Sequence, residues 1–143
     1  MVDGAGQVSP DGNWLAYESK ETDGTAWDIY VQSLTVPGDE KWRVTTDWGA
    51  NPRWSRDGRE IFYHARDGRL MSVAVSGSAQ TLKIERPVPL FEATLLGGTM
   101  PVVPLKQQYD VSKDGRFLLN LPVGTATEHA FNVVVNWTAE PKR

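Results

Sequence analysis

The side chains that could carry chemistry in this sequence are two histidines and 18 carboxylates, and the chain has no cysteine. His64 lies in an apolar run, whereas His129 lies in a polar segment far from it. Nucleophilic catalysis needs a base beside a serine or cysteine, and no Gly-x-Ser-x-Gly elbow is present. Two distant histidines also lack the spacing of zinc ligands. We therefore expect no catalytic residue, no metal site and no cofactor, with His64 a half-buried side chain whose hydrogen bonds are satisfied.

Many of the carboxylates sit in Asp-Gly turns, and one four-residue signature with such a turn occurs three times. The copies are Ser9-Pro10-Asp11-Gly12, Ser55-Arg56-Asp57-Gly58 and Ser112-Lys113-Asp114-Gly115. Ser-x-Asp-Gly suits a type I turn closed by a glycine at positive φ, in which the aspartate hydrogen-bonds the turn backbone. These aspartates are therefore predicted to be structural. A pair of carboxylates of the glycosidase kind remains as an alternative.

The signature marks an internal repeat, because its copies begin 46 and 57 residues apart, at positions 9, 55 and 112. A period of roughly 40–50 residues is typical of a propeller in which each blade has four strands. Each copy precedes a short aromatic and aliphatic run, and no segment shows a sustained helical period, so we predict an all-β fold. The expected strands lie near 6–9, 13–19, 27–34, 42–46, 51–55, 60–66, 69–76, 81–92, 107–112, 116–121 and 130–137.

The bulk composition fits a single domain, residues 1–143. A formal net charge of −3 argues against a nucleic-acid partner. No apolar run approaches the roughly 20 residues of a membrane-spanning helix, so no direct membrane insertion is expected. Six tryptophans are many for a chain of this length. We expect Trp14, Trp54 and Trp137 in the core, with Trp54 placed to wedge between two blades.

The repeated segments resemble the PD40 (WD40-like) repeats of TolB-like β-propellers. The resemblance rests on residues 9–17 with 28–31, on residues 51–63 and on residues 109–117, and it covers about residues 6–137. It implies a partial propeller with blades at about 6–46, 51–92 and 107–137, the last of them incomplete. Residues 133–140 resemble the closing segment of propeller regions in bacterial proteins, some of which also carry a Ser/Thr kinase domain. That likeness implies an extracytoplasmic, periplasmic location.

An incomplete propeller leaves sheet edges and apolar blade faces uncovered. Complete propellers of the family that the chain resembles usually have six or more blades, and this chain accounts for about three. We therefore expect a homodimer in which two half-rings close a six-bladed propeller, with equivalent contacts related by a two-fold axis. The alternative is a fragment that orders by local adaptation.

The loops that enter the innermost strands of a propeller form one face of its central channel. In this chain these loops are residues 46–53 and 106–109, and they bring an aromatic platform together with polar groups. That mixture suits a peptide or a small polar ligand. The alternative is blade-to-blade packing for Trp48 and a surface ion pair for Arg53. The candidate ligand-binding residues are Trp48, Asn51, Arg53 and Gln108.

The function that these features favour is non-enzymatic binding of a protein, peptide or small ligand, combined with self-association. Two alternatives stay open at this point. One is an accessory or gating propeller of a larger hydrolase, as in propeller-containing peptidases. The other is a purely structural propeller fragment. The scaffold alone does not fix the ligand, because propellers with the same fold bind different partners.

Overall fold

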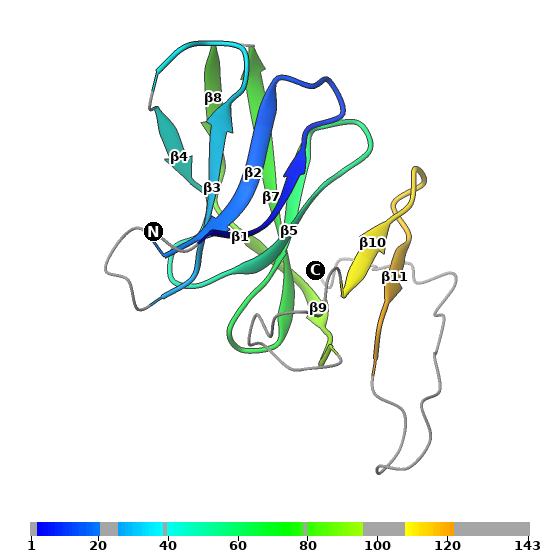
Figure 1. The fold of residues 1–143 in the computed structure, drawn as a ribbon. Coiled ribbons are helices and arrows are strands. Elements are labelled where there is room, and N and C mark those ends of the chain that lie inside the picture. Colours follow the sequence, from blue (N-terminus) through cyan, green and yellow to red (C-terminus); the bar gives the residue numbers. More distant parts are fainter. Residues whose placement is uncertain (1–2, 21–25, 39, 79, 96–107, 122–143) are drawn as a thin grey trace.

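A computed structural model describes residues 3–20, 26–38, 40–78, 80–95 and 108–121 of the chain (Figure 1). In these ranges the chain forms strands and turns without a helix, and the strand pairs are antiparallel. The all-β prediction is confirmed, and the separate sheets have the arrangement of a partial propeller. Within the described ranges, no segment is a helix of the length and apolarity that crossing a membrane requires.

The first sheet, blade 1, has four strands in the order of the sequence. Its innermost strand begins at Asp3, earlier than the expected position 6, and a register shift interrupts its pairing with the second strand. The strands of blade 1 are β1 (Asp3–Val8), β2 (Trp14–Ser19), β3 (Asp28–Ser33) and β4 (Lys41–Arg43).

The second sheet, blade 2, corrects one expected strand. Residues 81–92 form two strands, and both pair with β7: its first half with β9 and its second half with β8. Pro87 and Pro89 explain the break and the edge position, because proline cannot donate to a sheet ladder. The strands of blade 2 are β5 (Ala50–Trp54), β6 (Glu60–His64), β7 (Arg69–Ser78), β8 (Thr81–Ile84) and β9 (Val88–Glu92).

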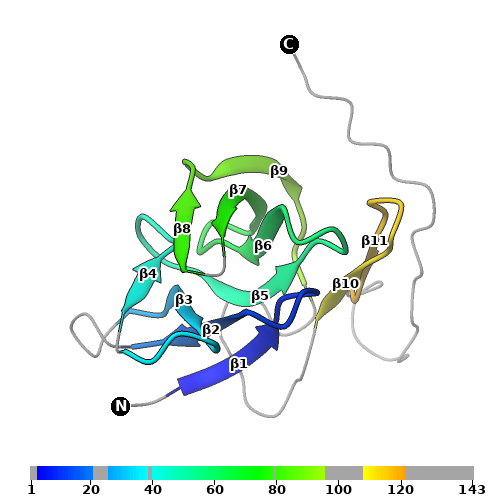
Figure 2. The same ribbon diagram turned by 90° about the horizontal axis from the view of Figure 1, so that it is seen from above.

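The third sheet, blade 3, contributes the antiparallel pair β10 (Tyr109–Val111) and β11 (Phe117–Leu119). The expected strand at 130–137, together with Trp137 and His129, lies outside the described residues. Figure 2 shows blade 1 and blade 3 on different sides of β5, so blade 2 is the central unit of the array.

The Ser-x-Asp-Gly turns connect the first two strands of each blade as the spacing predicts. In the second copy the Ser55 hydroxyl donates to Asp57 Oδ1 at 2.7 Å and accepts the Glu60 N–H at 2.9 Å. Hydrogen bonds from the Ser55 hydroxyl and the Arg59 N–H hold the pKa of Asp57 below its usual value. Gly58 has a φ of 72°, the left-handed region that glycine tolerates best. Asp57 therefore has the structural role that the sequence predicts.

The core has two parts, and each lies between neighbouring blades. Trp14 of blade 1 and Trp54 of blade 2 belong to the first part, in agreement with their prediction as core residues. Phe62 of blade 2 packs edge-on against Phe117 of blade 3 in the second part, with 5.0 Å between ring centroids. Burial of such side chains contributes roughly 1.5–3 kcal/mol each. The stacking of blades is therefore the main source of stability.

Candidate functional site

The inner strands β1, β5 and β10 begin at one end of the blades, and the start of β5 departs from regular strand geometry. The pairing of β5 with β6 shifts register between Ala50 and Arg53. Asn51, inside this bulge, has a φ of 56° and is the only non-glycine residue of the described ranges at positive φ. Bulges re-aim side chains and backbone groups, and they recur next to functional sites. We call this region the inner-strand junction: Glu18, Asn51, Arg53, Gln108 and Tyr109.

Glu18 of β2 ties two blades together at the junction. Its buried carboxylate accepts the Ala5 N–H of β1 at 2.8 Å and the Asn51 N–H of β5 at 2.9 Å. Each carboxylate oxygen thus holds the start of a different inner strand. The bulge turns the Asn51 amide toward blade 1, and the bond to Glu18 compensates the strain of the left-handed conformation.

Tyr109 of β10 links blade 3 to the same bulge. Its hydroxyl donates to the Asn51 carbonyl at 2.7 Å, and burial raises the pKa of this phenol, which keeps it protonated as a donor. Arg53 Nε donates to the Tyr109 carbonyl, and Arg53 Nη1 donates to the Pro52 carbonyl, both at 3.4 Å. One connected set of hydrogen bonds therefore runs across all three blades.

Arg53 is 3% exposed and lies between blades 2 and 3. Among the described residues no carboxylate lies within ion-pairing distance of its guanidinium. The surface ion pair considered as an alternative is therefore absent from this part of the chain. Arg53 is instead a buried cation that contacts carbonyl oxygens.

The other two sequence candidates are also buried. Gln108 precedes β10, and its Oε1 accepts from Asn120 Nδ2 at 3.3 Å. Trp48 lies in the loop before β5, where the Gly49 N–H donates to the Trp27 carbonyl at 2.9 Å. Within the described ranges no hydrogen bond joins Trp48 to the other three candidates. Asn51 and Arg53 thus both bond Tyr109. The Gln108 amide bonds Asn120 instead, and Trp48 presents no exposed ring face.

Sequence reasoning missed Glu18 and Tyr109, although the repeat carries a signal for Glu18. The strand pairing of each blade puts Glu18, His64 and Asn120 at the same position, just after the apolar run of the second strand. His64 is buried, and its Nε2 lies 2.9 Å from the Ala93 carbonyl, so this nitrogen carries the proton. His64 is therefore satisfied, as expected, and is more deeply buried than expected. A polar residue that recurs at this position marks a contact between strands or blades.

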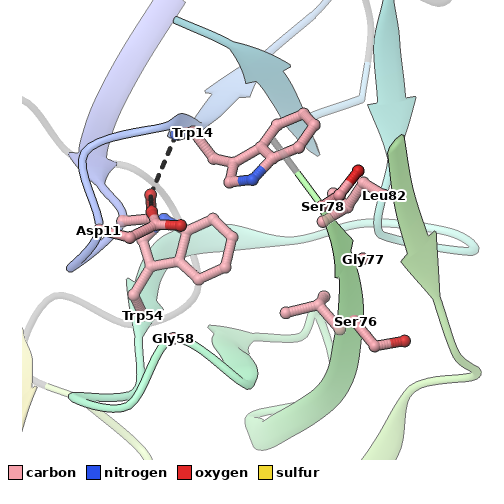
Figure 3. Close-up of a pocket in the computed structure, with 10 residues that line it drawn as sticks. Asp11, Trp14, Trp54, Gly58, Ser76, Gly77, Ser78 and Leu82 are labelled. Carbon is pink, nitrogen blue, oxygen red and sulfur yellow. Dashed lines mark hydrogen bonds between the residues drawn. The ribbon is translucent and has the colours of Figure 1, made fainter. Parts of the chain in front are cut away.

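A small pocket lies at the opposite end of the first blade joint, beside the Ser-x-Asp-Gly turns (Figure 3). Its volume is about 130 Å³, and Trp14, Trp54 and Leu82 supply its apolar walls. Asp11 stands at its rim, where the Ser9 hydroxyl and the Asn13 N–H lower the pKa of its carboxyl. This volume is well below the roughly 300–1,000 Å³ of typical ligand pockets. The inner-strand junction is therefore the stronger candidate site.

Comparison with known proteins adds no relative to this geometry. A scan against protein-family models and a search of curated proteins found no match. Within the described residues, no group of three or more His, Cys, Asp or Glu side chains is arranged to hold a metal ion. The contacts and charges of the inner-strand junction are therefore the basis for proposing a function.

Proposed function

We propose that this chain is a non-enzymatic, propeller-type binding module of the TolB-like kind. It takes a protein, peptide or small polar ligand at the inner-strand junction, and it self-associates to close a six-bladed ring. The observation that carries the binding proposal is Arg53, a buried cation with only carbonyl partners among the described residues. The ligand group that complements this cation is a carboxylate.

A guanidinium loses its hydration when it is buried. That loss is offset only when an anion or several good hydrogen bonds replace the water. The two carbonyl contacts of Arg53 are 3.4 Å long, beyond the roughly 2.7–3.2 Å of ordinary N–H···O bonds. A carboxylate accepts two parallel bonds from one guanidinium at shorter distances. An acidic ligand would therefore stabilise Arg53 more than its present partners do.

One neighbour of Arg53 supports the same region as a ligand site. Asn51 holds a left-handed backbone conformation, which is uncommon for a residue with a side chain and recurs where strain serves a function. A positive charge beside a strained backbone segment suits the carboxylate of an acidic peptide.

The direct test uses acetate as the smallest carboxylate probe. Acetate is titrated into ¹⁵N-labelled protein while the arginine Nε–H resonances are followed by NMR. We expect the Arg53 resonance to shift and saturate with a Kd on the order of millimolar, because so small a ligand gains little binding energy. Acetamide, which has the same shape without the charge, is expected to leave the resonance in place.

Arg56 provides a matched control inside the same molecule. Its Nε also donates across the blade joint to a carbonyl, that of Val111 at 3.3 Å, but its side chain is exposed. The Arg56→Gln variant should keep the acetate response of Arg53. The Arg53→Lys variant has no Nε–H resonance, so the backbone amides of Asn51 and Tyr109 are followed instead, and their shifts should no longer saturate with acetate. An Arg53 resonance that ignores acetate, or that moves equally with acetamide, contradicts the proposal.

A further inference from the structure

The three blades repeat the same inner-strand pairing, so equivalent residues can be assigned without ambiguity. Val8 pairs with Leu15 in blade 1, Trp54 with Ile61 in blade 2, and Val111 with Phe117 in blade 3. In blades 2 and 3 these pairs point toward the preceding blade and belong to the two parts of the core. We call this side of a blade its backward face.

The backward face of blade 1 is uncovered. Val8 is 49% exposed, whereas its equivalents Trp54 and Val111 are each 3% exposed. Leu34 follows β3 at the position that Val75 occupies on β7, and its exposure is 50% against 6%. The Leu34 N–H donates to the Asn13 carbonyl, and the Val75 N–H donates to the Arg59 carbonyl. Asn13 and Arg59 each directly follow a Ser-x-Asp-Gly turn, so Leu34 and Val75 are equivalent. Val8 and Leu34 are thus exposed apolar residues at positions where the equivalent residues of the other blades are buried.

On the opposite side of each blade, its forward face, the described residue of the second strand is exposed in blade 3 and buried in blades 1 and 2. Ala16, Phe62 and Leu118 are equivalent, because they pair with Gln7, Arg53 and Asp110 on the inner strands. Ala16 and Phe62 are buried against the following blade, whereas Leu118 is 49% exposed. In the described residues, the backward face of blade 1 and the forward face of blade 3 therefore each expose an apolar residue whose equivalents are buried.

The inner strand adds a polar contact to each joint. Gln7 Oε1 accepts the Trp54 N–H at 2.7 Å, and Arg53 Nε donates to the Tyr109 carbonyl. In both cases a forward-pointing side chain bonds the inner-strand backbone of the next blade. Asp110 is the equivalent residue of blade 3. Its side chain is 55% exposed, and its carboxylate accepts the Val111 N–H at 2.9 Å and lies 3.9 Å from Arg56 Nη2. A carboxylate there can accept a backbone N–H from a following blade, as the Gln7 amide oxygen does.

We propose that the forward face of blade 3, Asp110 and Leu118, docks on the backward face of blade 1, Val8, Leu15 and Leu34, in a second copy of this chain. A second copy carries both halves of the contact, and two copies cover both faces at once by closing a ring of six blades. The Phe62–Phe117 contact, moved along by one blade, places Leu118 against Leu15 of the partner. Asp110 is equivalent to Gln7, and Val8 is equivalent to Trp54. A bond like that between Gln7 and Trp54 would therefore join the Asp110 carboxylate to the Val8 N–H of the second copy. This inference rests on the self-association part of the proposed function.

The test uses engineered cysteines, because the natural chain has none. The single variants Leu15→Cys and Leu118→Cys are prepared separately, mixed, oxidised and analysed by non-reducing electrophoresis and mass spectrometry. The mixture is expected to give a disulfide-linked pair with one chain of each kind, and neither variant alone should give a linked pair. The second pair, Val8→Cys with Asp110→Cys, should behave in the same way and replaces the first if Leu15→Cys does not fold.

Val88→Cys is the matched control, because Val88 is 57% exposed on β9 of blade 2 and belongs to neither of the two proposed docking faces. Mixed with Leu118→Cys, it should give no more linked product than collision in solution does. The proposal is overturned if both cysteine pairs stay unlinked, if the control links equally, or if Leu15→Cys links to itself. The acetate titration at Arg53 is independent of this result, so each proposal can fail without the other.

Discussion

At the scale of single residues, polar side chains at the inner strands hold the backbone of the next strand or blade. Gln7 accepts the Trp54 N–H, Glu18 accepts the Asn51 N–H, and Tyr109 donates to the Asn51 carbonyl. Buried polar groups of this kind are costly when unpaired and specify one arrangement when paired. These residues therefore fix how the blades sit against each other, and Arg53 is the one whose hydrogen bonds to described residues are two long carbonyl contacts.

Tyr63 predicts how stability responds to alkaline pH. Burial in the first part of the core, followed by the charges of Asp67 and Asp47, raises its pKa to about 12. The unfolded chain loses this proton near pH 10 and the folded protein only near pH 12. The contribution is therefore fully present below pH 10 and is lost as pH rises toward 12, by roughly 2–3 kcal/mol.

The measurement is the free energy of unfolding in urea at pH 8, 10 and 11 for the natural chain and for Tyr63→Phe. The variant should lose less stability over this range, because its ring has no proton to release. Tyr109, whose pKa burial also raises, continues to contribute in both proteins. Equal losses in the two proteins would show that Tyr63 ionises as freely when folded as when unfolded.

The candidate residues show what a sequence can and cannot predict about a site. The repeat predicts that the loops entering the inner strands lie on one face, and Asn51 and Arg53 both bond Tyr109, whereas Gln108 bonds Asn120. The sequence left open whether Trp48 packs between blades, and it did not predict the burial of Arg53, because burial depends on which face of a blade a side chain occupies. A bulge sets the orientation at Asn51, and the local sequence has no pattern that predicts a bulge.

At the scale of elements, the strand positions in the described residues follow from the repeated signature, apart from the earlier start of β1 at Asp3 and the divided outer strand of blade 2. Ser-x-Asp-Gly fixes the turn, and the apolar runs fix the strands on either side of it. A fourth turn of the same shape, residues 65–68, has alanine in place of serine, so the Ser-x-Asp-Gly signature does not identify it. The outer strand of blade 2 was expected as one piece, because alternation alone does not show that β7 pairs with two separate strands.

The β7–β8 hairpin offers a sharp test of backbone strain. Gly77 has a φ of 150°, and a Cβ atom added there would collide with the Thr81 carbonyl. Gly38 has a φ of 149°, but a Cβ there would meet nothing within 4 Å. We expect Gly38→Ala to cost about 1–2 kcal/mol from φ alone, and Gly77→Ala to cost about 1–3 kcal/mol more from the collision.

Urea unfolding of the two alanine variants measures this difference. The two glycines share their φ and differ in the atoms around them. The difference between the two losses of stability therefore isolates the close approach of β7 and β8. Equal destabilisation would mean that the hairpin opens without cost. In that case β8 would contribute little to holding Leu82 and Ile84 against the first part of the core.

At the scale of the whole molecule, the described parts of the three blades form two joints, and they expose apolar residues on the backward face of blade 1 and the forward face of blade 3. The joints share a plan: apolar residues on both faces and one inner-strand side chain that reaches forward to the next backbone. Residues such as Val8 and Leu118 are explained by their position in this plan, since their equivalents are buried. These exposed positions are the basis of the proposal that two copies of the chain associate through them.

The mass of the chain in solution tests this account most directly. Light scattering across a range of concentrations should give a mass that rises from 15.9 kDa toward twice that value. Leu34→Asp, which puts a charge into the uncovered face of blade 1, should hold the protein at the lower mass. A natural chain that stays at 15.9 kDa at every concentration, or a Leu34→Asp variant that associates as well as the natural chain, would contradict the account.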